Sequence, residues 1–399
     1  MLDQSVVDSY LRCPKCYSEG LLKYNRDEMI CNNCGSVSKV KFGIPALLGN
    51  EEVGIGSNKF LGLTDKVSNL YKKRGMNPFR RVVGQELMHF FNFIYFTIKF
   101  GVKKILKQKY CHEVERALYG SGGWKNYFNL ILKSGEIYQF NRMKKYIVEP
   151  SLEIGCSDCA TTNMIFKENV EHITFGCEYF MDGFLNVNDR NRLSDGMYKV
   201  IKNYVGGSIK SLPFRSSIFA SLYMVHIIDH IVNIAPLFNE INRILKPGGY
   251  FVMSSFSKNV FENLPGVKLL KLFSSRWSEN YKEQRVTRNN PRGSKLKSNY
   301  EFDATGQNLF SIEEWREIAE KYGFEVIDYA FFGKYFSHFM DIECRGYYNS
   351  KLFNKFIYAA ISEMVDQEKI NPLLEKESTQ IILVLKKVKN IVPDRVKES

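Results

Sequence analysis

The sequence predicts an α/β fold built around a mostly parallel sheet with helices on both faces, preceded by a small cysteine-rich module. Residues 146–180 have the pattern of a strand, a tight turn, a helix and a second strand. A second helix-to-strand unit follows at 234–254, where a Lys-Pro-Gly-Gly turn separates the two elements. Alternating strands and helices favour a parallel sheet, because each connection crosses one face of the sheet.

Length and composition limit the number of domains and the classes of partner that the chain can have. Its 399 residues allow two or three domains, and 44% hydrophobic with 14% aromatic residues suffice for a packed core. A formal charge of +13 favours contact with polyanions, which include nucleic acid, anionic lipid and phosphorylated substrates. The first residues lack a basic segment followed by an apolar one, so we expect no secretory signal and a cytoplasmic protein.

Four cysteines predict a structural zinc site in a zinc ribbon that covers residues 1–50. They form two Cys-x-x-Cys pairs, which are Cys13, Cys16, Cys31 and Cys34. Two short turns at this separation bring four thiolates into a tetrahedral site, and the alternative is four free thiols in a loop. Gly35 follows the second pair, where a tight turn needs a residue without Cβ. This use of cysteine indicates a reducing compartment.

Residues 51–145 predict a helical linker or lid region. Its aromatic basic segment 87–106 approaches the length of a membrane span, but His89, Asn92 and Lys99 interrupt it. Basic residues flank the segment, as in helices that lie in an anionic membrane interface. Three interpretations stay open: a packing helix of a lid, an interfacial helix in peripheral contact with the inner face of the membrane, or a membrane span.

Residues 146–255 predict the core of the larger domain. A first strand over 146–154 leads into Gly155, Cys156 and Ser157, which are small or turn-forming, and then into a helix over 160–168. A second strand ends at Glu178, about 20 positions after the turn. This arrangement brings a helix N-terminus close to a carboxylate, which suits an adenosine-containing cofactor whose ribose hydroxyls the carboxylate binds.

The rest of the chain completes the sheet around an insertion. A strand over 218–225, a helix over 234–245 and a strand over 250–254 precede a basic insertion at 256–308. In that insertion, seven Lys and Arg residues between positions 276 and 297 form either a solvated face or a site that recruits phosphate. Residues 309–390 supply the last helix, closing strands over 324–332 and 380–388, and a substrate lid. Ser311 and Glu314 predict a capping box at the start of that helix, and Gly323 is expected to end it. Residues 391–399 are expected to form a flexible tail.

The motifs of this core resemble those of class I S-adenosylmethionine-dependent methyltransferases. Residues 152–156 resemble the family's first motif, and residues 175–178 resemble the second, which carries the ribose-binding acid. Residues 211–214 resemble its LPF turn, and the segment NEINRILKPGG at 239–249 resembles its RxLKPGG turn. The resemblance covers roughly residues 146–255 and 309–332 and implies a Rossmann-like, mostly parallel sheet of seven strands. The cysteine module resembles the zinc ribbon of some tRNA-methyltransferase activator proteins.

The resemblance also implies a cofactor, S-adenosyl-L-methionine, and a set of residues that hold it. Glu178 binds the ribose hydroxyls, the first turn lets the backbone pass the methionine part, and Ser208 stands beside the adenine. The residues expected at the cofactor are Glu153, Gly155, Cys156, Ser157, Glu178, Ser208 and Ile209. The family has two further glycines in the first turn, where this chain has Ser157 and Cys159.

His226 and His230 are the candidate catalytic residues. Both follow the strand over 218–225, at the carboxyl edge of the sheet, where ligands bind in folds of this kind. One of them is expected to take the proton of the methyl acceptor, with His226 preferred. The alternative for each is a structural hydrogen bond.

Three classes of function remain open. The preferred one is a methyltransferase that acts on a glycan, a lipid-linked acceptor or another small phosphorylated molecule, because aromatic and basic segments suit such a substrate. An RNA methyltransferase is favoured by the zinc ribbon and the net charge of +13. The third is a catalytically degenerate methyltransferase fold that serves as a binding or scaffold subunit.

Overall fold

The computed structural model describes residues 2–25, 27–41, 44–48, 139, 142–156, 174–178, 203–231, 233–260, 262–263, 265–280, 309–333 and 373–391. The aromatic segment 87–106, the helix expected at 160–168, Ser157 and the basic residues at 282–297 lie outside these ranges. Within them, no helix is both long and apolar enough to cross a membrane.

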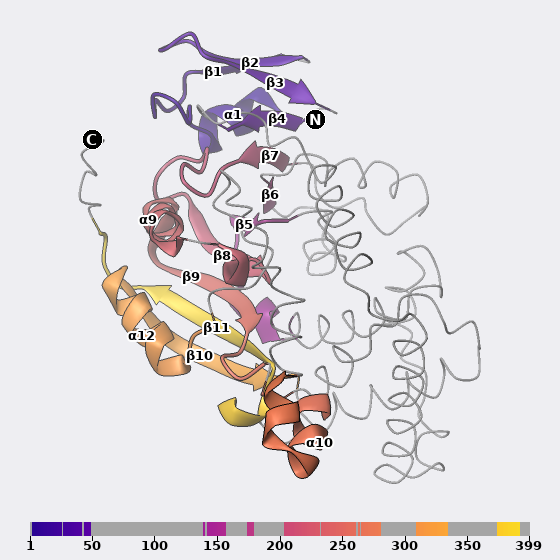
Figure 1. Ribbon diagram of the computed structural model, residues 1–399. Helices are drawn as coiled ribbons and strands as arrows, with labels where there is room; N and C mark the ends of the chain where they lie inside the picture. The colour runs from indigo at the N-terminus through magenta and orange to yellow at the C-terminus, as the bar shows by residue number, and fades with distance from the viewer. Residues whose placement is uncertain are drawn as a thin grey trace, which may run out of the picture.

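Eleven strands form one sheet in the order β1-β2-β3-β4-β7-β6-β5-β8-β9-β11-β10 (Figure 1). Its parallel centre consists of β7 (Asn203–Gly207), β6 (Thr174–Glu178), β5 (Ser151–Ile154), β8 (Phe219–Val225) and β9 (Leu245–Phe256). Two antiparallel strands, β11 (Gln380–Lys387) and β10 (Phe324–Phe332), continue the sheet beyond β9. These seven strands confirm the predicted mostly parallel α/β sheet.

The first strand of the core is shorter than the sequence predicts. It was expected over 146–154, whereas β5 begins at Ser151 and Tyr146 ends a short 3₁₀ helix, η1 (Lys144–Tyr146). The Tyr146 hydroxyl donates to Asp328 Oδ2 at 2.6 Å, which ties this segment to β10 instead. Pro150 has no N–H to donate to a ladder, so regular pairing starts after it.

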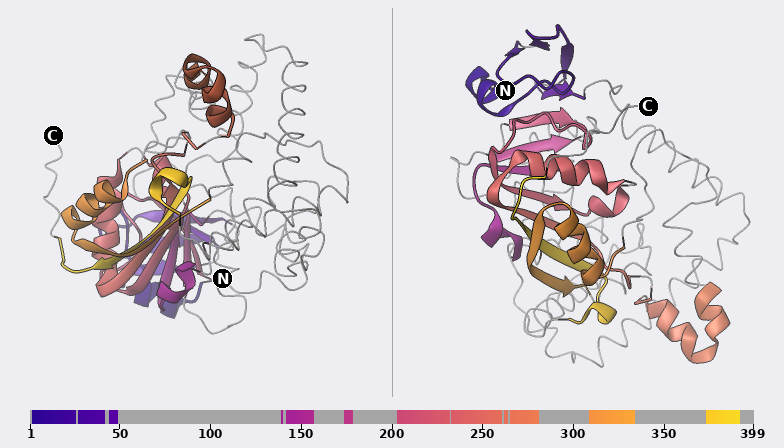
Figure 2. Two further views of the ribbon diagram at one scale, coloured as in Figure 1. Left: turned by 90° about the horizontal axis from the view of Figure 1, so that it is seen from below. Right: turned by 90° about the vertical axis from the view of Figure 1, so that its left-hand side faces the viewer.

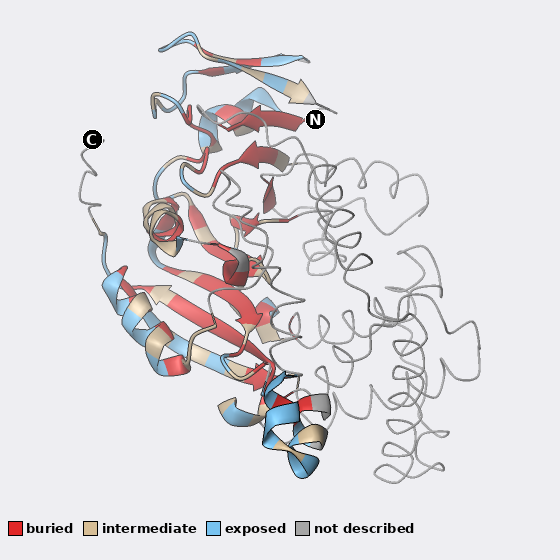
Figure 3. Cartoon of the chain, in the orientation of Figure 1, coloured by how far each residue is buried: buried red, intermediate tan, exposed pale blue. Residues whose placement is uncertain are grey.

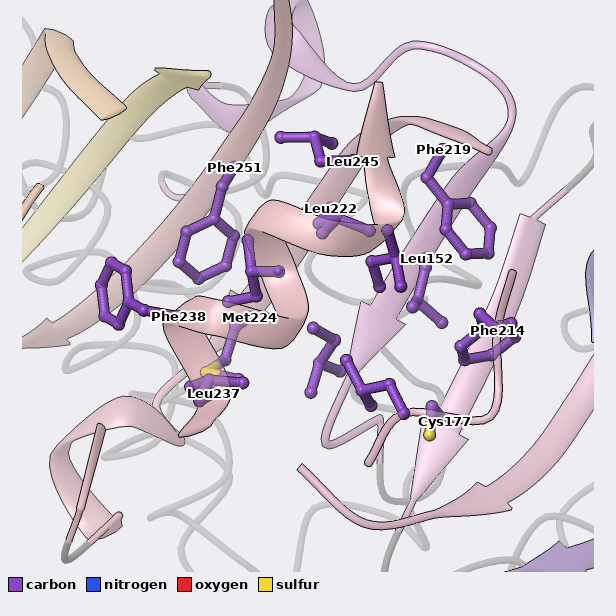
Figure 4. Close-up of a cluster of buried hydrophobic side chains, with 14 of the residues drawn as sticks. Leu152, Cys177, Phe214, Phe219, Leu222, Met224, Leu237, Phe238, Leu245 and Phe251 are labelled. Carbon is purple, nitrogen blue, oxygen red and sulfur yellow. The ribbon is translucent and has the colours of Figure 1, made fainter. Parts of the chain in front are cut away.

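Side chains alternate between the two faces of the sheet. One face buries Leu222 of β8 and Phe251 of β9 against Phe238 of α9 (Ile234–Ile244) and Trp315 of α12 (Ile312–Lys321). Figure 4 shows the part of this cluster that surrounds α9. The other face carries a second cluster, composed of Met143, Tyr223, Val252, Phe332, Ile382 and Val384.

The helix α12 begins and ends as its sequence predicts. Ser311 and Glu314 form the expected capping box at the start of α12, and Gly323 follows that helix with φ +79°. The Asn233 side chain caps α9 by accepting from the Ala235 N–H. The long strand β9 follows α9 directly, and Gly248 near its start has φ +75°, a backbone conformation that favours glycine.

The N-terminal module is continuous with the core sheet. It contains α1 (Gln4–Tyr10), β1 (Leu22–Tyr24), β2 (Glu28–Cys31), β3 (Val37–Lys41) and β4 (Ile44–Leu47). β4 pairs antiparallel with β3 and parallel with β7, where Ala46 lies opposite Gly206. The four small strands therefore extend the edge of the core sheet, as the upper part of Figure 1 shows.

The insertion after β9 includes a second helical unit. α10 (Pro265–Phe273) is followed after Ser274 by another helical stretch at 275–280. Figure 2 shows this pair standing away from the sheet.

Candidate active site and cysteine cluster

The candidate cofactor site lies at the carboxyl ends of β5 and β6. Ile154 pairs with Cys177, so Gly155 and Glu178 follow at neighbouring strand ends. Gly155 has φ +72°, and a Cβ there would lie 2.7 Å from Ile227 Cγ1, so both the conformation and the packing require glycine. The N–H groups of Gly155 and Cys156 both donate to the Cys177 carbonyl, at 2.9 and 3.3 Å, which fixes the turn against β6.

Two carboxylates are buried at this edge. Glu178 ends β6 and is 7% exposed, and Glu153 lies inside β5 with 2% exposure. Burial also raises the pKa of the neighbouring Cys177 thiol, which therefore stays protonated. A buried carboxylate next to a left-handed glycine turn can accept hydrogen bonds from the ribose hydroxyls of an adenosine cofactor.

Ser208 and Ile209 lie directly after β7, the strand beside β6. Ser208 is buried and bridges to Ser211, and its hydroxyl accepts from the Lys210 N–H at 3.3 Å. The preceding Gly207 was not singled out from the sequence. A Cβ on Gly207 would lie 2.7 Å from Pro213 Cδ and 2.8 Å from Cys177 Sγ, so both side chains pack closely on Gly207 and leave no room for a larger residue.

His226 follows β8 with a left-handed backbone, φ +51°, which is rare outside glycine. Its Nε2 lies 2.9 Å from Gln139 Nε2, and its ring centroid lies 5.3 Å from that of Phe256. The next residue, Ile227, packs on the Gly155 turn. His226 is thus held beside the expected cofactor turn. His230 ends the 3₁₀ helix η2 (Ile228–His230), and its side chain lies outside the described part of the chain.

Gln139 is the centre of a buried polar network that the sequence did not reveal. Its amide nitrogen donates to Gln380 Oε1 at 3.1 Å, and its oxygen accepts from the Ser254 hydroxyl at 3.0 Å. Gln139, Ser254 and Gln380 are each at most 2% exposed. With the amide in this orientation, its second N–H donates to His226 Nε2, so the imidazole proton resides on Nδ1.

The four cysteines of the N-terminal module meet at one point. Their sulfur atoms lie within 4.8 Å of one another. The pair Cys13 and Cys34 is 3.8 Å apart, and the pair Cys16 and Cys31 is 3.7 Å apart. A tetrahedral zinc ion with bonds of about 2.3 Å separates its sulfur ligands by about 3.8 Å, so the cluster fits zinc.

The two cysteine turns have matching backbones. Tyr17 and Gly35 each follow a Cys-x-x-Cys pair, with φ of 62° and 68°, and each donates its N–H to the carbonyl of the first cysteine of its pair at 2.9 Å. The Asn33 amide donates to Cys16 Sγ and, together with hydrogen bonds from Ser18, lowers the pKa of this thiol to about 5, which favours the thiolate that a metal needs.

The first cysteine turn is bonded to the turn at 211–214. Arg12 donates its backbone N–H to the Pro213 carbonyl and forms an ion pair with Glu240 of α9 at 3.1 Å. The Ser211 hydroxyl donates to the Pro14 carbonyl at 3.3 Å. If the first cysteine turn loses its structure, the loop at 211–214 therefore loses the hydrogen bonds from Arg12 and to Pro14 that hold it in place.

We predict that the protein binds about one zinc ion per chain in a tetrahedral thiolate site. Cobalt substitution should give the intense visible bands of such a site, and Cys34→Ser should lower both the bands and the metal content. Cys344→Ser, which changes a cysteine outside the quartet, is the control. Metal removal should also speed hydrogen exchange at 203–214, because Arg12 and Pro14 lose their fixed positions. Unchanged metal content in Cys34→Ser would contradict the assignment.

Comparison with known proteins gives one family match and several likenesses to solved structures. Residues 152–253 match the model of a family described as a methyltransferase domain. Among solved structures, phosphoethanolamine N-methyltransferase 2 of Haemonchus contortus is 17% identical, with 67% of this chain and 53% of that chain covered and a TM-score of 0.37. Geranyl diphosphate C-methyltransferase of Streptomyces coelicolor A3(2) is 13% identical, with 68% and 88% covered and a TM-score of 0.38.

No curated protein matches the chain. The family match spans β5 to β9, the strands that form the parallel part of the sheet and its carboxyl edge. A left-handed glycine turn and a buried acid lie at that edge, as the first two motifs of such domains require. Residues 152–253 are therefore similar to a methyltransferase domain, and the geometry of their carboxyl edge is in keeping with that likeness.

Proposed function

We propose that the protein transfers the methyl group of S-adenosylmethionine to a small phosphorylated acceptor, of the glycan or lipid-linked type. The observation that carries the cofactor half of the proposal is the juxtaposition of the Gly155 turn and buried Glu178 at adjacent strand ends. When bound, S-adenosylmethionine supplies a methyl carbon that its sulfonium activates toward in-line displacement. The enzyme then has mainly to align donor and acceptor.

The chain's own residues divide this work. Glu178 accepts hydrogen bonds from the ribose hydroxyls, and the turn at Gly155, Cys156 and Ser157 gives the methionine part room to pass. Ser208 and Ile209 flank the adenine from the end of β7. Glu153 orients the cofactor amino group through water.

His226 is the proposed base for the acceptor proton. Its ring is fixed by Gln139 at Nε2 and by Phe256 against its face. Gln139 donates to Nε2, which carries the lone pair of the neutral ring, so Nε2 is the atom that takes the acceptor proton once this hydrogen bond opens. Gln139 is then a positioning residue, since it acts on the acceptor only through the orientation and tautomer of His226.

The acceptor class rests on charge. The chain has 56 basic and 43 acidic residues, which favours a phosphorylated acceptor over a neutral one. RNA is the competing polyanion, and the likeness of the cysteine module to zinc ribbons of tRNA-methyltransferase activators favours it. The salt dependence of binding distinguishes RNA from a small phosphorylated acceptor. RNA affinity falls steeply as the salt concentration rises, because many phosphates are contacted.

We predict that Glu178→Gln weakens S-adenosylmethionine binding by about 10- to 100-fold, because hydrogen bonds to a charged acceptor contribute about 1.5–3 kcal/mol. Isothermal titration calorimetry measures this directly. Glu325→Gln, which changes an exposed acid on β10, should bind as the wild type does. Circular dichroism establishes that both variants are folded. Equal affinity in folded Glu178→Gln would show that the cofactor lies elsewhere.

We predict that Gln139→Glu shifts the acidic limb of the kcat/KM pH profile toward higher pH by about one unit, because a carboxylate beside His226 favours imidazolium. Gln139→Leu should lower kcat more than it raises KM. Gln4→Glu on exposed α1 is the matched control and should leave the profile unchanged. A Gln139→Glu profile identical to the wild type would remove His226 from the proton transfer.

A further inference from the structure

The helical unit after β9 exposes three large apolar side chains at its tip. Leu272 and Phe273 at the end of α10 are 80% and 74% exposed, and Trp277 in the next helical stretch is 61% exposed. Figure 3 shows α10 as one of the most exposed parts of the described chain. Most other exposed apolar residues are scattered singly over the surface, whereas these three lie within six consecutive positions. Clustered apolar exposure of this kind marks an interaction surface.

Buried hydrogen bonds fix the base of this helical unit to the sheet. The Ser257 hydroxyl and the Asn263 amide both donate to the Ser378 carbonyl, at 2.8 and 2.7 Å, in a buried setting. Within the unit, the buried Ser278 hydroxyl donates to the Val267 carbonyl at 2.8 Å, which clamps the two helical stretches together. The apolar tip is therefore presented by a hairpin whose base is fixed to the end of β9 and the start of β11.

Basic side chains accompany the apolar ones. Lys268, Lys271 and Arg276 are exposed on the same hairpin, and Lys271 and Arg276 are direct neighbours of Leu272 and Trp277 in the chain. Aromatic and aliphatic side chains beside lysine and arginine match an anionic lipid surface, because the apolar groups enter the acyl boundary while the cations meet the headgroups. Trp in particular favours the level of the headgroups.

We propose that the hairpin formed by α10 and residues 275–280 docks the protein on an anionic membrane surface. Leu272, Phe273 and Trp277 enter the interface, and Lys271 and Arg276 contact the lipid phosphates. The charge of the hairpin selects a membrane over a protein partner, since a protein interface is depleted in Lys at its centre. The proposal goes beyond methyl transfer and stands independently of the identity of the acceptor.

The test measures binding of the full-length, zinc-loaded protein to vesicles. Vesicles of phosphatidylcholine with one third phosphatidylglycerol should retain the protein in a flotation assay, and vesicles of phosphatidylcholine alone should not. Leu272→Ser combined with Phe273→Ser should weaken binding about tenfold or more, because two large side chains lose their apolar burial. Lys271→Gln combined with Arg276→Gln should weaken it in low salt and have less effect in high salt.

Val388→Ser is the matched control, because Val388 is 57% exposed at the end of β11, far from the hairpin in the sequence. It should bind vesicles as the wild type does. Brominated lipid should quench the fluorescence of the wild type, and Trp277→Phe should lose this quenching. Unchanged vesicle binding in the Leu272 and Phe273 double variant would overturn the proposal. A double variant that changes from dimer to monomer in sedimentation would also overturn it, by assigning the surface to a protein interface.

Discussion

Glu240 lies where the N-terminal module, the turn at 211–214 and α9 meet. Its carboxylate accepts from the Leu212 N–H at 2.7 Å, from Arg243 at 2.7 Å and from Arg12 at 3.1 Å. Arg12 and Arg243 also donate to the Leu212 carbonyl. Loss of one partner in such a mostly buried ion network costs about 3–5 kcal/mol, because the remaining charges stay buried without compensation. The position of the turn at 211–214 depends on this carboxylate.

This network explains why the cysteine module and the methyltransferase core form one sheet. Pairing of β4 with β7 supplies only two residue partners, Ala46 with Gly206 and Leu47 with Gly207. The contacts through Arg12, together with the tilted packing of the Tyr10 ring on the Phe175 ring with centroids 4.8 Å apart, secure the remainder of the junction. A metal in the cysteine cluster would stabilise the module and, through Arg12, the loop that follows β7.

Local patterns predicted much of the fold. The strand at 218–225, the helix at 234–245 and the capping box at Ser311 depend on hydrophobic period and on neighbours three or four residues away, and the structure has all three. The first strand was predicted too long, because its ladder is decided by Pro150 and by a hydrogen bond from Tyr146 to the distant Asp328. The pairing of β4 with β7 joins residues about 160 positions apart, which no local pattern specifies.

The same division holds for the site. The spacing of the cysteines and the Gly155 and Glu178 pattern are local, and the structure brings each set together at one place. Gln139 is different, because glutamine is not a chemically distinctive residue and its partners Ser254 and Gln380 lie 115 and 241 positions away in the chain. His226 was found from its position after a strand, but its left-handed backbone and its partner depend on this tertiary network.

The central claim is that S-adenosylmethionine binds at the carboxyl edge formed by β5, β6 and the loop after β7. Hydrogen–deuterium exchange with and without S-adenosylmethionine, followed by mass spectrometry of peptic fragments, tests it most directly. The account predicts slower exchange in fragments that cover 151–156, 174–178 and 203–214, with β10 and β11 unchanged. Slower exchange confined to other segments, or none at saturating cofactor, would contradict it.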